Sequence, residues 1–236
     1  MPGRARLTKN PSALPLSKEE ITLALSNSSP SSAPGPNGVP YSVWKRVNLI
    51  NPTIIIALLS PLVAFGYHPL SLKTPNRVVL DKPGKACYDS SSSFCIIFLL
   101  TTISKVLERV MTVRLSAIVT SKVLLYPDQC GSLPGLRHSK DCIALIHEVR
   151  TLQRPRQKAS TLYLDIKVGF DKVNALTLRA RLLASHIPCY MVDWVSSFVS
   201  ERTCTLVFPQ QKKYLASDPS VLRPDASDVP SAFSMP

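Results

Sequence analysis

The stretch that most limits the possible folds is LTTISKVLERVMTVRLSAIVTSK, residues 100–122. Its apolar side chains recur at near-helical spacing, with basic residues among the polar positions. The apolar set is Ile103, Val106, Leu107, Val110, Val113 and Leu115. A long helix with one apolar face has to pack against other elements. Because the β-rich runs NRVVLD and STLYLDI stand on either side of it, the sequence predicts an α+β fold with several helices and few strands.

Shorter patterns place the other elements. Ser17 and Glu20 have the spacing of a capping box, which predicts a helix from about Lys18, and Asn174 is expected to cap a helix over 174–186. Further helices are predicted at 41–47, 52–66, 138–153 and 188–202. Strands are predicted at the start of 76–85 and at 160–166, with a hairpin over 204–217. The segment SSPSSAPGPNGVP, residues 28–40, is a loop with a turn at Asn37-Gly38.

Composition narrows the class of protein. The chain has 236 residues, of which 45% are hydrophobic, and a formal charge of +13. A charge of this size suits a polyanionic partner such as nucleic acid, although a solvated basic surface gives the same count. The six cysteines form no CxxC pair and no secretory signal precedes them, so we expect reduced thiols in an intracellular protein, nuclear or cytoplasmic. The longest apolar run is interrupted by Ser60 and Pro61, so no membrane span is predicted.

The segment LYLDIKVGFDKV contains two aspartates, Asp165 and Asp171, on either side of a short apolar run. By themselves they fit a polar residue at a strand rim and a helix cap. A functional interpretation needs a carboxylate held at a strand end, where a Mg²⁺ ion can contact both it and a substrate phosphate. The order of the surrounding segments decides between the two interpretations.

Several stretches occur in the order and at the approximate spacing of one known family. They are SSAPGPNGVPYSVWKRV, GYHPLSLKTPNRVVLDKPGK, LLTTISKVLERVMTVRL, LLYPDQCGSLPGLRHSKDCI, LYLDIKVGFDKV and IPCYMVDWVSSFVSERT. Through them residues 17–236 resemble the reverse transcriptase domain of non-LTR (LINE-type) retrotransposons, and residues 1–16 form a basic, flexible lead-in. The resemblance implies the fingers and first part of the palm of a right-hand polymerase fold, with RNA or DNA template-primer and dNTP as partners and Mg²⁺ as cofactor.

The resemblance also implies roles for single residues. Asp165 matches the catalytic aspartate that binds the metal ions, and the Ile166 carbonyl is an additional metal ligand. Phe170 matches the bulky side chain beneath the incoming sugar, where it would exclude a 2′-hydroxyl; an ordinary core aromatic is the alternative. Asp171 is expected to be structural.

The basic turn DKPGK matches the family's fingers turn. Lys82 is the expected triphosphate contact and Lys85 a second one, because a lysine ammonium is a good point-charge partner for phosphate. An exposed turn with two solvated lysines is an equally supported alternative.

Other positions depart from the family pattern. FCIIFLL stands where the family has Tyr-Arg-Pro-Ile-Ser-Leu-Leu, so Cys95 replaces an arginine that grips phosphate and Ile96 replaces a proline. SDVPSAFSMP lacks a Gln-Gly pair, and no stretch of the 236 residues matches the Tyr-x-Asp-Asp turn or a thumb.

Because two-metal phosphoryl transfer requires several carboxylates, Asp165 alone cannot support it. We therefore expect a degenerate, truncated fragment of a retrotransposon RNA-directed DNA polymerase that is inactive by itself. The alternatives are a non-catalytic basic nucleic-acid-binding remnant and a poorly folded pseudogene product. The sequence gives no sign of a protein or membrane partner.

Overall fold

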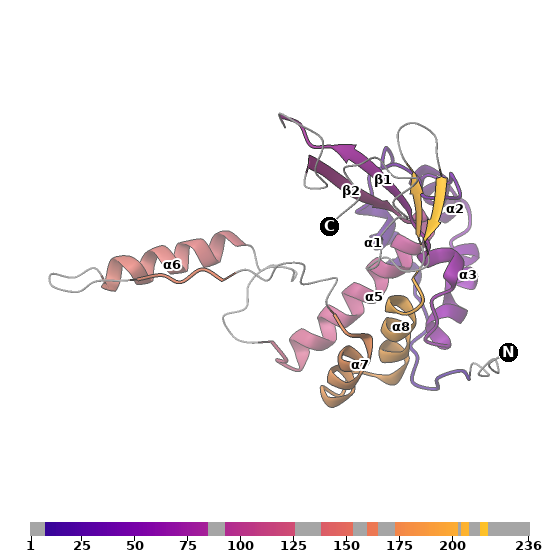
Figure 1. The fold of residues 1–236 in the computed structure, drawn as a ribbon. Coiled ribbons are helices and arrows are strands. Elements are labelled where there is room, and N and C mark those ends of the chain that lie inside the picture. Colours follow the sequence, from indigo (N-terminus) through magenta and orange to yellow (C-terminus); the bar gives the residue numbers. More distant parts are fainter. Residues whose placement is uncertain are drawn as a thin grey trace. The chain divides into compact units, whose positions relative to one another are not determined.

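The computed structural model describes residues 8–84, 93–125, 138–152, 160–164, 173–202, 204–207 and 213–216. They fall into two compact units, the first drawn from Met1–Met111 and Asn174–Pro236 and the second from Thr112–Val173. The first unit contains most of the helices and all the described strands (Figure 1). The mixture confirms the predicted α+β class.

Apart from the short α4, which was not predicted, the described helices begin and end close to where the sequence places them. Their bounds are α1 Lys18–Ser26, α2 Tyr41–Ile50, α3 Thr53–Ala64, α4 Leu70–Lys73, α5 Thr102–Ser121, α6 His138–Leu152, α7 Ala175–Ala184 and α8 Cys189–Val199. The predicted capping box is present, since Ser17 Oγ accepts from Glu20 N at 3.2 Å and Glu20 Oε2 accepts from Ser17 N at 2.9 Å. Asn174 Oδ1 caps α7 by accepting from two backbone N–H groups. Local side-chain chemistry therefore starts both helices.

The described strands form one four-stranded sheet in the order β2-β1-β3-β4. Their bounds are β1 Asn76–Asp81, β2 Phe94–Leu99, β3 Cys204–Val207 and β4 Lys213–Ala216. β1 pairs antiparallel with β2 and parallel with β3, and β3 pairs antiparallel with β4. The predicted hairpin at 204–217 is confirmed. The strand β2 and the parallel pairing of β1 with β3 had no counterpart in the prediction.

The predicted strand at 160–166 is wrong over the described residues 160–164. Ser160–Leu164 is not in a strand, and the side chains of Leu162 and Leu164 are 81% and 86% exposed. A strand is stable when its backbone groups pair with a neighbour and one face is covered, and these five residues are not among the strands of the described sheet. Asp165 and Ile166 lie outside the described residues.

The core of the first unit surrounds the first half of α5. Ile103, Val106, Leu107 and Val110 are buried, as predicted, and so is Met111. The predicted apolar face does not continue, since Val113 is half exposed. Most of the other buried apolar side chains come from α1, α3 and α8, and they include Ile21, Leu25, Ile55, Leu59, Val63, Met191 and Val192. Burial of this set is the main source of stabilisation.

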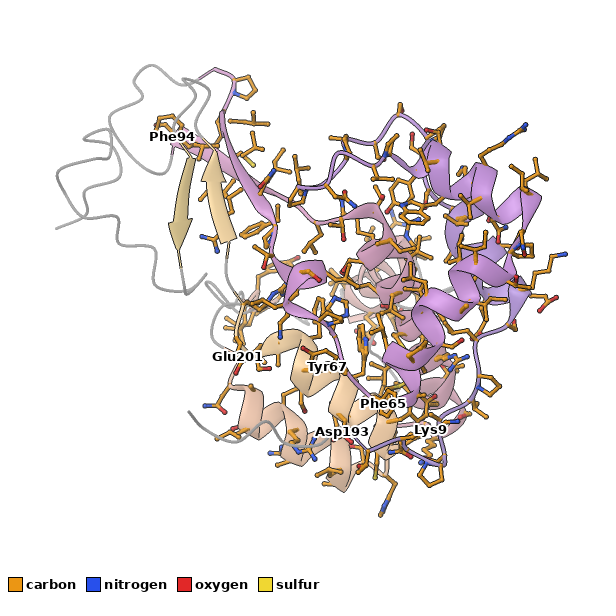
Figure 2. The ribbon with its side chains drawn as sticks, turned by 90° about the vertical axis from the view of Figure 1, so that its right-hand side faces the viewer. Lys9, Phe65, Tyr67, Phe94, Asp193 and Glu201 are labelled. Carbon is orange, nitrogen blue, oxygen red and sulfur yellow. The ribbon has the colours of Figure 1, made fainter. Side chains whose placement is uncertain are left out.

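Helix α3 is joined closely to α8. Gly66 has φ +56°, and a Cβ atom on it would lie 2.7 Å from the Asp193 Cβ and 2.8 Å from the Tyr190 carbonyl oxygen. Figure 2 shows Phe65 and Tyr67, which flank this glycine, next to Asp193. The backbone after α3 can approach α8 this closely because residue 66 has no side chain.

Within the described part of the chain, no single helix has the length and apolar character needed to cross a membrane. The pair α2 and α3 meets the length and composition criteria together, with a bend of 110° between the two helices.

Candidate functional site

One of the five predicted site residues can be placed in the structure. Lys82 directly follows β1, at the end of the β1–β2 hairpin. Lys85, Asp165, Ile166 and Phe170 lie outside the described residues. The described part of the candidate site is therefore this hairpin and the part of the first unit that supports it.

Backbone pairing fixes the position of Lys82 just beyond the paired strands. Six residue pairs join β1 and β2, from Asn76 opposite Leu99 to Asp81 opposite Phe94. Beyond the last pair the Lys82 N–H donates to the Ser93 carbonyl at 2.9 Å, so the backbone at Lys82 is fixed. The Lys82 side chain is exposed, and Gly84 follows with φ +78° and open space around it. A lysine with a fixed backbone and an exposed side chain suits contact with an anionic ligand.

The two faces of the hairpin differ in what they bury. Arg77 and Val79 lie on one face of β1 and are both buried, opposite Phe98 and Ile96. The Arg77 guanidinium lies over the Phe98 ring, 4.5 Å from its centroid. The other face carries Cys95, which is exposed and opposite Leu80. Cys95, which the resemblance aligns with an arginine, is thus an exposed thiol, and Arg77 is a buried cation on the opposite face.

The base of the hairpin is fastened to the loop between α1 and α2. A Cβ atom on Gly35 would lie 2.4 Å from both the carbonyl carbon and the carbonyl oxygen of Leu100, which follows β2. Next to this contact the Trp44 Nε1 donates to Thr102 Oγ1 at 2.9 Å, and Thr102 Oγ1 donates to the Val39 carbonyl at 2.7 Å. These contacts fix the end of β2 and the start of α5.

A buried group of ionisable side chains lies beside α5, and the sequence did not indicate it. Ser104 Oγ donates to Glu108 Oε1 at 2.7 Å, so the Ser104 oxygen is left to accept from His68 Nε2 at 3.1 Å. Burial lowers the pKa of His68 to about 4, and the charges of Lys73 and Arg202 act in the same direction. Burial raises the pKa of Glu108. Both shifts favour the uncharged forms of these two groups, as expected in an interior.

The same group ties α8 to the segment before β1. His68 N donates to Ser197 Oγ at 3.0 Å, and the Lys73 ammonium donates to the Ser197 carbonyl at 2.7 Å. The carbonyl lies near the end of α8, where a cation is favoured by the helix dipole. Burial lowers the pKa of Lys73, with Glu201 opposing that shift.

The aromatic rings of α8 complete this group. Trp194 and Phe198 stack with centroids 5.3 Å apart, and the His68 ring meets both of them edge-on. The Arg202 guanidinium lies over the Phe198 ring, 4.5 Å from its centroid. The four-residue spacing of Trp194, Phe198 and Arg202 is the sequence signal that could have indicated the stack. A lone histidine in an apolar stretch gave no comparable signal.

The described residues contain no group of three or more His, Cys, Asp or Glu side chains placed to hold a metal ion. The ionised oxygens that suit Mg²⁺ are carboxylates, and the carboxylate predicted for that role, Asp165, is in a segment that the structure does not describe.

Comparison with known proteins finds two proteins to which this chain is similar. No family model matches the chain. A probable RNA-directed DNA polymerase from transposon X-element of Drosophila melanogaster is 24% identical over 189 residues, 80% of this chain and 21% of that protein. The corresponding protein from transposon BS of the same organism is 23% identical over 159 residues, 67% of this chain and 17% of that protein. The chain thus spans about a fifth of the length of these curated relatives. The matched part is a reverse transcriptase-like region.

Proposed function

We propose that this chain supplies the fingers and the first part of the palm of a non-LTR retrotransposon reverse transcriptase, in a right-hand polymerase fold. The observation that carries the proposal is the match to the X-element polymerase over 80% of the chain. The ordered motifs of the sequence support it. In the reaction of such an enzyme a primer 3′-hydroxyl attacks the α-phosphate of a dNTP, using RNA as template.

Three residues of the first palm motif would act at the reacting end of the nucleotide. The Asp165 carboxylate and the Ile166 carbonyl are oxygen donors, which is the ligand chemistry that Mg²⁺ prefers. When bound, the metal ions would neutralise charge between the attacking and leaving oxygens. Phe170 would exclude a ribose 2′-hydroxyl and so favour deoxynucleotides.

The hairpin would contact the triphosphate. Lys82 is exposed at the end of β1, and its backbone is held by the bond to Ser93. This arrangement supports a contact between the Lys82 ammonium and a phosphate, with Lys85 as a second contact three residues further on. The buried face of β1 and the contact of Gly35 with Leu100 would keep the hairpin in position when the ligand binds.

A second candidate is a basic nucleic-acid-binding module without catalysis. The observation that favours it is the formal charge of +13. Such a module would bind through phosphate contacts, so its affinity would fall steeply as salt is raised and would depend little on base sequence.

Nucleotide binding separates the two candidates. Calorimetric titration of the purified 236-residue chain with dTTP and with UTP, each with Mg²⁺, is expected to show preferential binding of dTTP. Asp165→Ala should remove the effect of Mg²⁺ on binding, and Phe170→Ala should allow UTP to bind as well as dTTP. Lys82→Gln should weaken dTTP binding about tenfold, the loss expected for one charge-assisted phosphate contact. Lys18→Gln, at an exposed lysine that begins α1, is the matched control.

Binding of a fluorescent RNA–DNA primer-template across a salt series completes the test. Salt-sensitive binding of the duplex without any dTTP binding would favour the second candidate. Absence of duplex binding at low salt, about 50 mM, would contradict both candidates. Primer extension by this chain alone is expected to be undetectable, because one positioned carboxylate cannot hold two metal ions. Extension that depends on Mg²⁺ and is lost in Asp165→Ala would overturn that expectation.

A further inference from the structure

The full sequence contains three Ser/Thr-Pro steps, and the structure presents one of them in an exposed loop. Ser29-Pro30 lies between α1 and α2, with the Ser29 side chain exposed. Ser60-Pro61 lies inside α3, and Thr74-Pro75 follows α4, where Thr74 Oγ1 donates to the Leu70 carbonyl at 2.9 Å. A hydroxyl that must enter the active site of another enzyme has to be exposed on a segment outside regular secondary structure. Ser29 meets that condition, and the other two are constrained by their helices.

The loop around Ser29 projects from a fixed base. Ser29 and Ser32 form a turn in which Ser32 N donates to the Ser29 carbonyl at 3.2 Å, and the Ser29 and Ser31 hydroxyls are 2.8 Å apart. Both hydroxyls are exposed. A few residues later the loop is held by the close approach of Gly35 to Leu100. The turn is thereby presented at one position on the surface of the first unit.

Two cations converge on the residue that precedes Ser29. The Lys45 ammonium donates to the Ser28 carbonyl at 2.7 Å, so it touches the peptide unit that joins Ser28 to Ser29. The Arg109 guanidinium donates to the Ala24 carbonyl at 2.9 Å and to Ser28 Oγ. The acidic side chains of α1 are in its first turn, at the opposite end of the helix. A negative group on Ser29 would therefore meet positive charge.

We propose that Ser29 is a phosphorylation site for a proline-directed protein kinase, and that Lys45 receives the phosphate. The Ser29 Oγ attacks the γ-phosphorus of ATP. The Oγ–P bond forms, the bond from the γ-phosphorus to the bridging oxygen breaks, ADP leaves, and the hydroxyl proton passes to the base of the kinase. The phosphoserine carries about −1.5 to −2 charges at neutral pH. The Lys45 ammonium, which already lies against the neighbouring carbonyl, pairs with it.

Site mapping tests the first half of the proposal. The purified 236-residue chain is incubated with ATP and a purified kinase selective for Ser-Pro and Thr-Pro steps, and the products are mapped by tandem mass spectrometry. The expected result is one phosphate, on Ser29, that is lost in Ser29→Ala and in Pro30→Ala and kept in Ser60→Ala and Thr74→Ala. A peptide of residues 24–34 serves as the control for kinase acceptance. Phosphorylation of the peptide but not of the chain, or of neither, would overturn the site.

Phosphorus NMR tests the second half. In the phosphorylated chain the second pKa of the phosphoserine is expected to lie below its usual value of about 6, because the Lys45 charge stabilises the dianion. Lys45→Gln should raise that pKa by a few tenths, whereas Lys18→Gln should leave it unchanged, since Lys18 is about 12 Å away along α1. An unchanged pKa in Lys45→Gln would show that Lys45 does not receive the phosphate.

Discussion

The helix α5 and the β1–β2 hairpin adjoin in the chain and are both rich in apolar residues, but they bury these residues to different extents. Leu107 of α5 is 0% exposed and Val106 is fully buried with it. On β2, Ile97 and Phe98 are 40% and 47% exposed. The first half of the helix thus contributes one face to the core, whereas the hairpin buries a few side chains of β1 and leaves the rest partly or fully exposed.

This difference shows how the hairpin is held. An element with little buried apolar surface opens locally more easily than the core does. The hairpin compensates at its base, through the Gly35–Leu100 contact and the Trp44–Thr102 bond, and on one face through Arg77. Lys82 is therefore positioned by backbone pairing and by anchors at the base, and less by packing around it.

The largest expected effect comes from removing core volume. Leu107→Ala should lower the free energy of unfolding by about 3 kcal/mol, because a fully buried leucine loses both its transfer energy and its packing. Ile97→Ala on the hairpin should cost about 1 kcal/mol or less, since much of that side chain is already in water. Urea denaturation of both variants measures the contrast. Equal losses would mean that the two elements are buried to the same extent in solution.

The second effect concerns acid stability of the core. His68 binds a proton with a pKa of about 4 in the folded chain and about 6.5 when unfolded, so the unfolded state takes up the proton first. The free energy of unfolding that depends on neutral His68 is at its maximum above pH 6.5. It decreases by up to about 3 kcal/mol as the pH falls towards 4. Glu108 acts oppositely, because its raised pKa gives stability at low pH that is lost as the pH rises through that pKa.

Thermal melts between pH 7 and pH 4.5 check the role of His68. The slope of stability against pH should become flatter in His68→Gln, which keeps an amide near Ser104. The control His186→Asn replaces an exposed histidine and should keep the slope. A slope that is unchanged in His68→Gln would show that another group accounts for the acid sensitivity.

The third effect concerns the contact between Gly35 and Leu100 at the base of the hairpin. Gly35→Ala places a Cβ atom 2.4 Å from backbone atoms of Leu100, so the loop or the end of β2 has to shift. The expected cost is about 2 kcal/mol, accompanied by faster amide hydrogen exchange in β2. Gly38→Ala is the matched control, because φ there is +68° but nothing lies within 4 Å. It should cost about 1 kcal/mol and leave exchange in β2 unchanged.

The smallest effect is on the face of the hairpin that carries the buried Arg77 and Val79. Phe98→Leu keeps an apolar side chain but removes the ring beneath the Arg77 guanidinium. The expected loss is about 0.5–1 kcal/mol, the usual contribution of a cation–π contact. Ile97→Leu, on the other face of β2, should be close to neutral. A larger loss of unfolding free energy in Ile97→Leu than in Phe98→Leu would show that the Arg77–Phe98 contact does not stabilise the hairpin.

Features set by neighbouring residues were predictable from the sequence. Ser17 and Asn174 cap their helices through bonds to residues two or three positions away, and the apolar spacing of α5 identifies its buried face as far as Val110. The end of β1 at Asp81 follows from the turn residues Pro83 and Gly84. In each case the physical cause lies within one or two turns of the chain.

Features set by distant residues were not predictable. The strand β2 contains a run of apolar residues that fits a strand or a helix segment, and its pairing with β1 depends on a partner elsewhere. The bond between His68 and Ser104 joins residues 36 positions apart, and the one between His68 and Ser197 spans 129 positions. The predicted roles of Asp165, Ile166, Phe170 and Lys85 stay predictions, because these residues lie outside the described structure.

The parallel pairing of β1 with β3 has a consequence for synthesis. Asn76 pairs with Thr205, so one side of β1 has no partner until the ribosome has added more than a hundred further residues. At about 5–20 residues per second that interval is on the order of ten seconds. The β1–β2 hairpin can form early in it, with Val78 and Val79 on an open strand edge that invites pairing with other chains. A chaperone that covers this edge during translation would therefore raise the yield of folded chain.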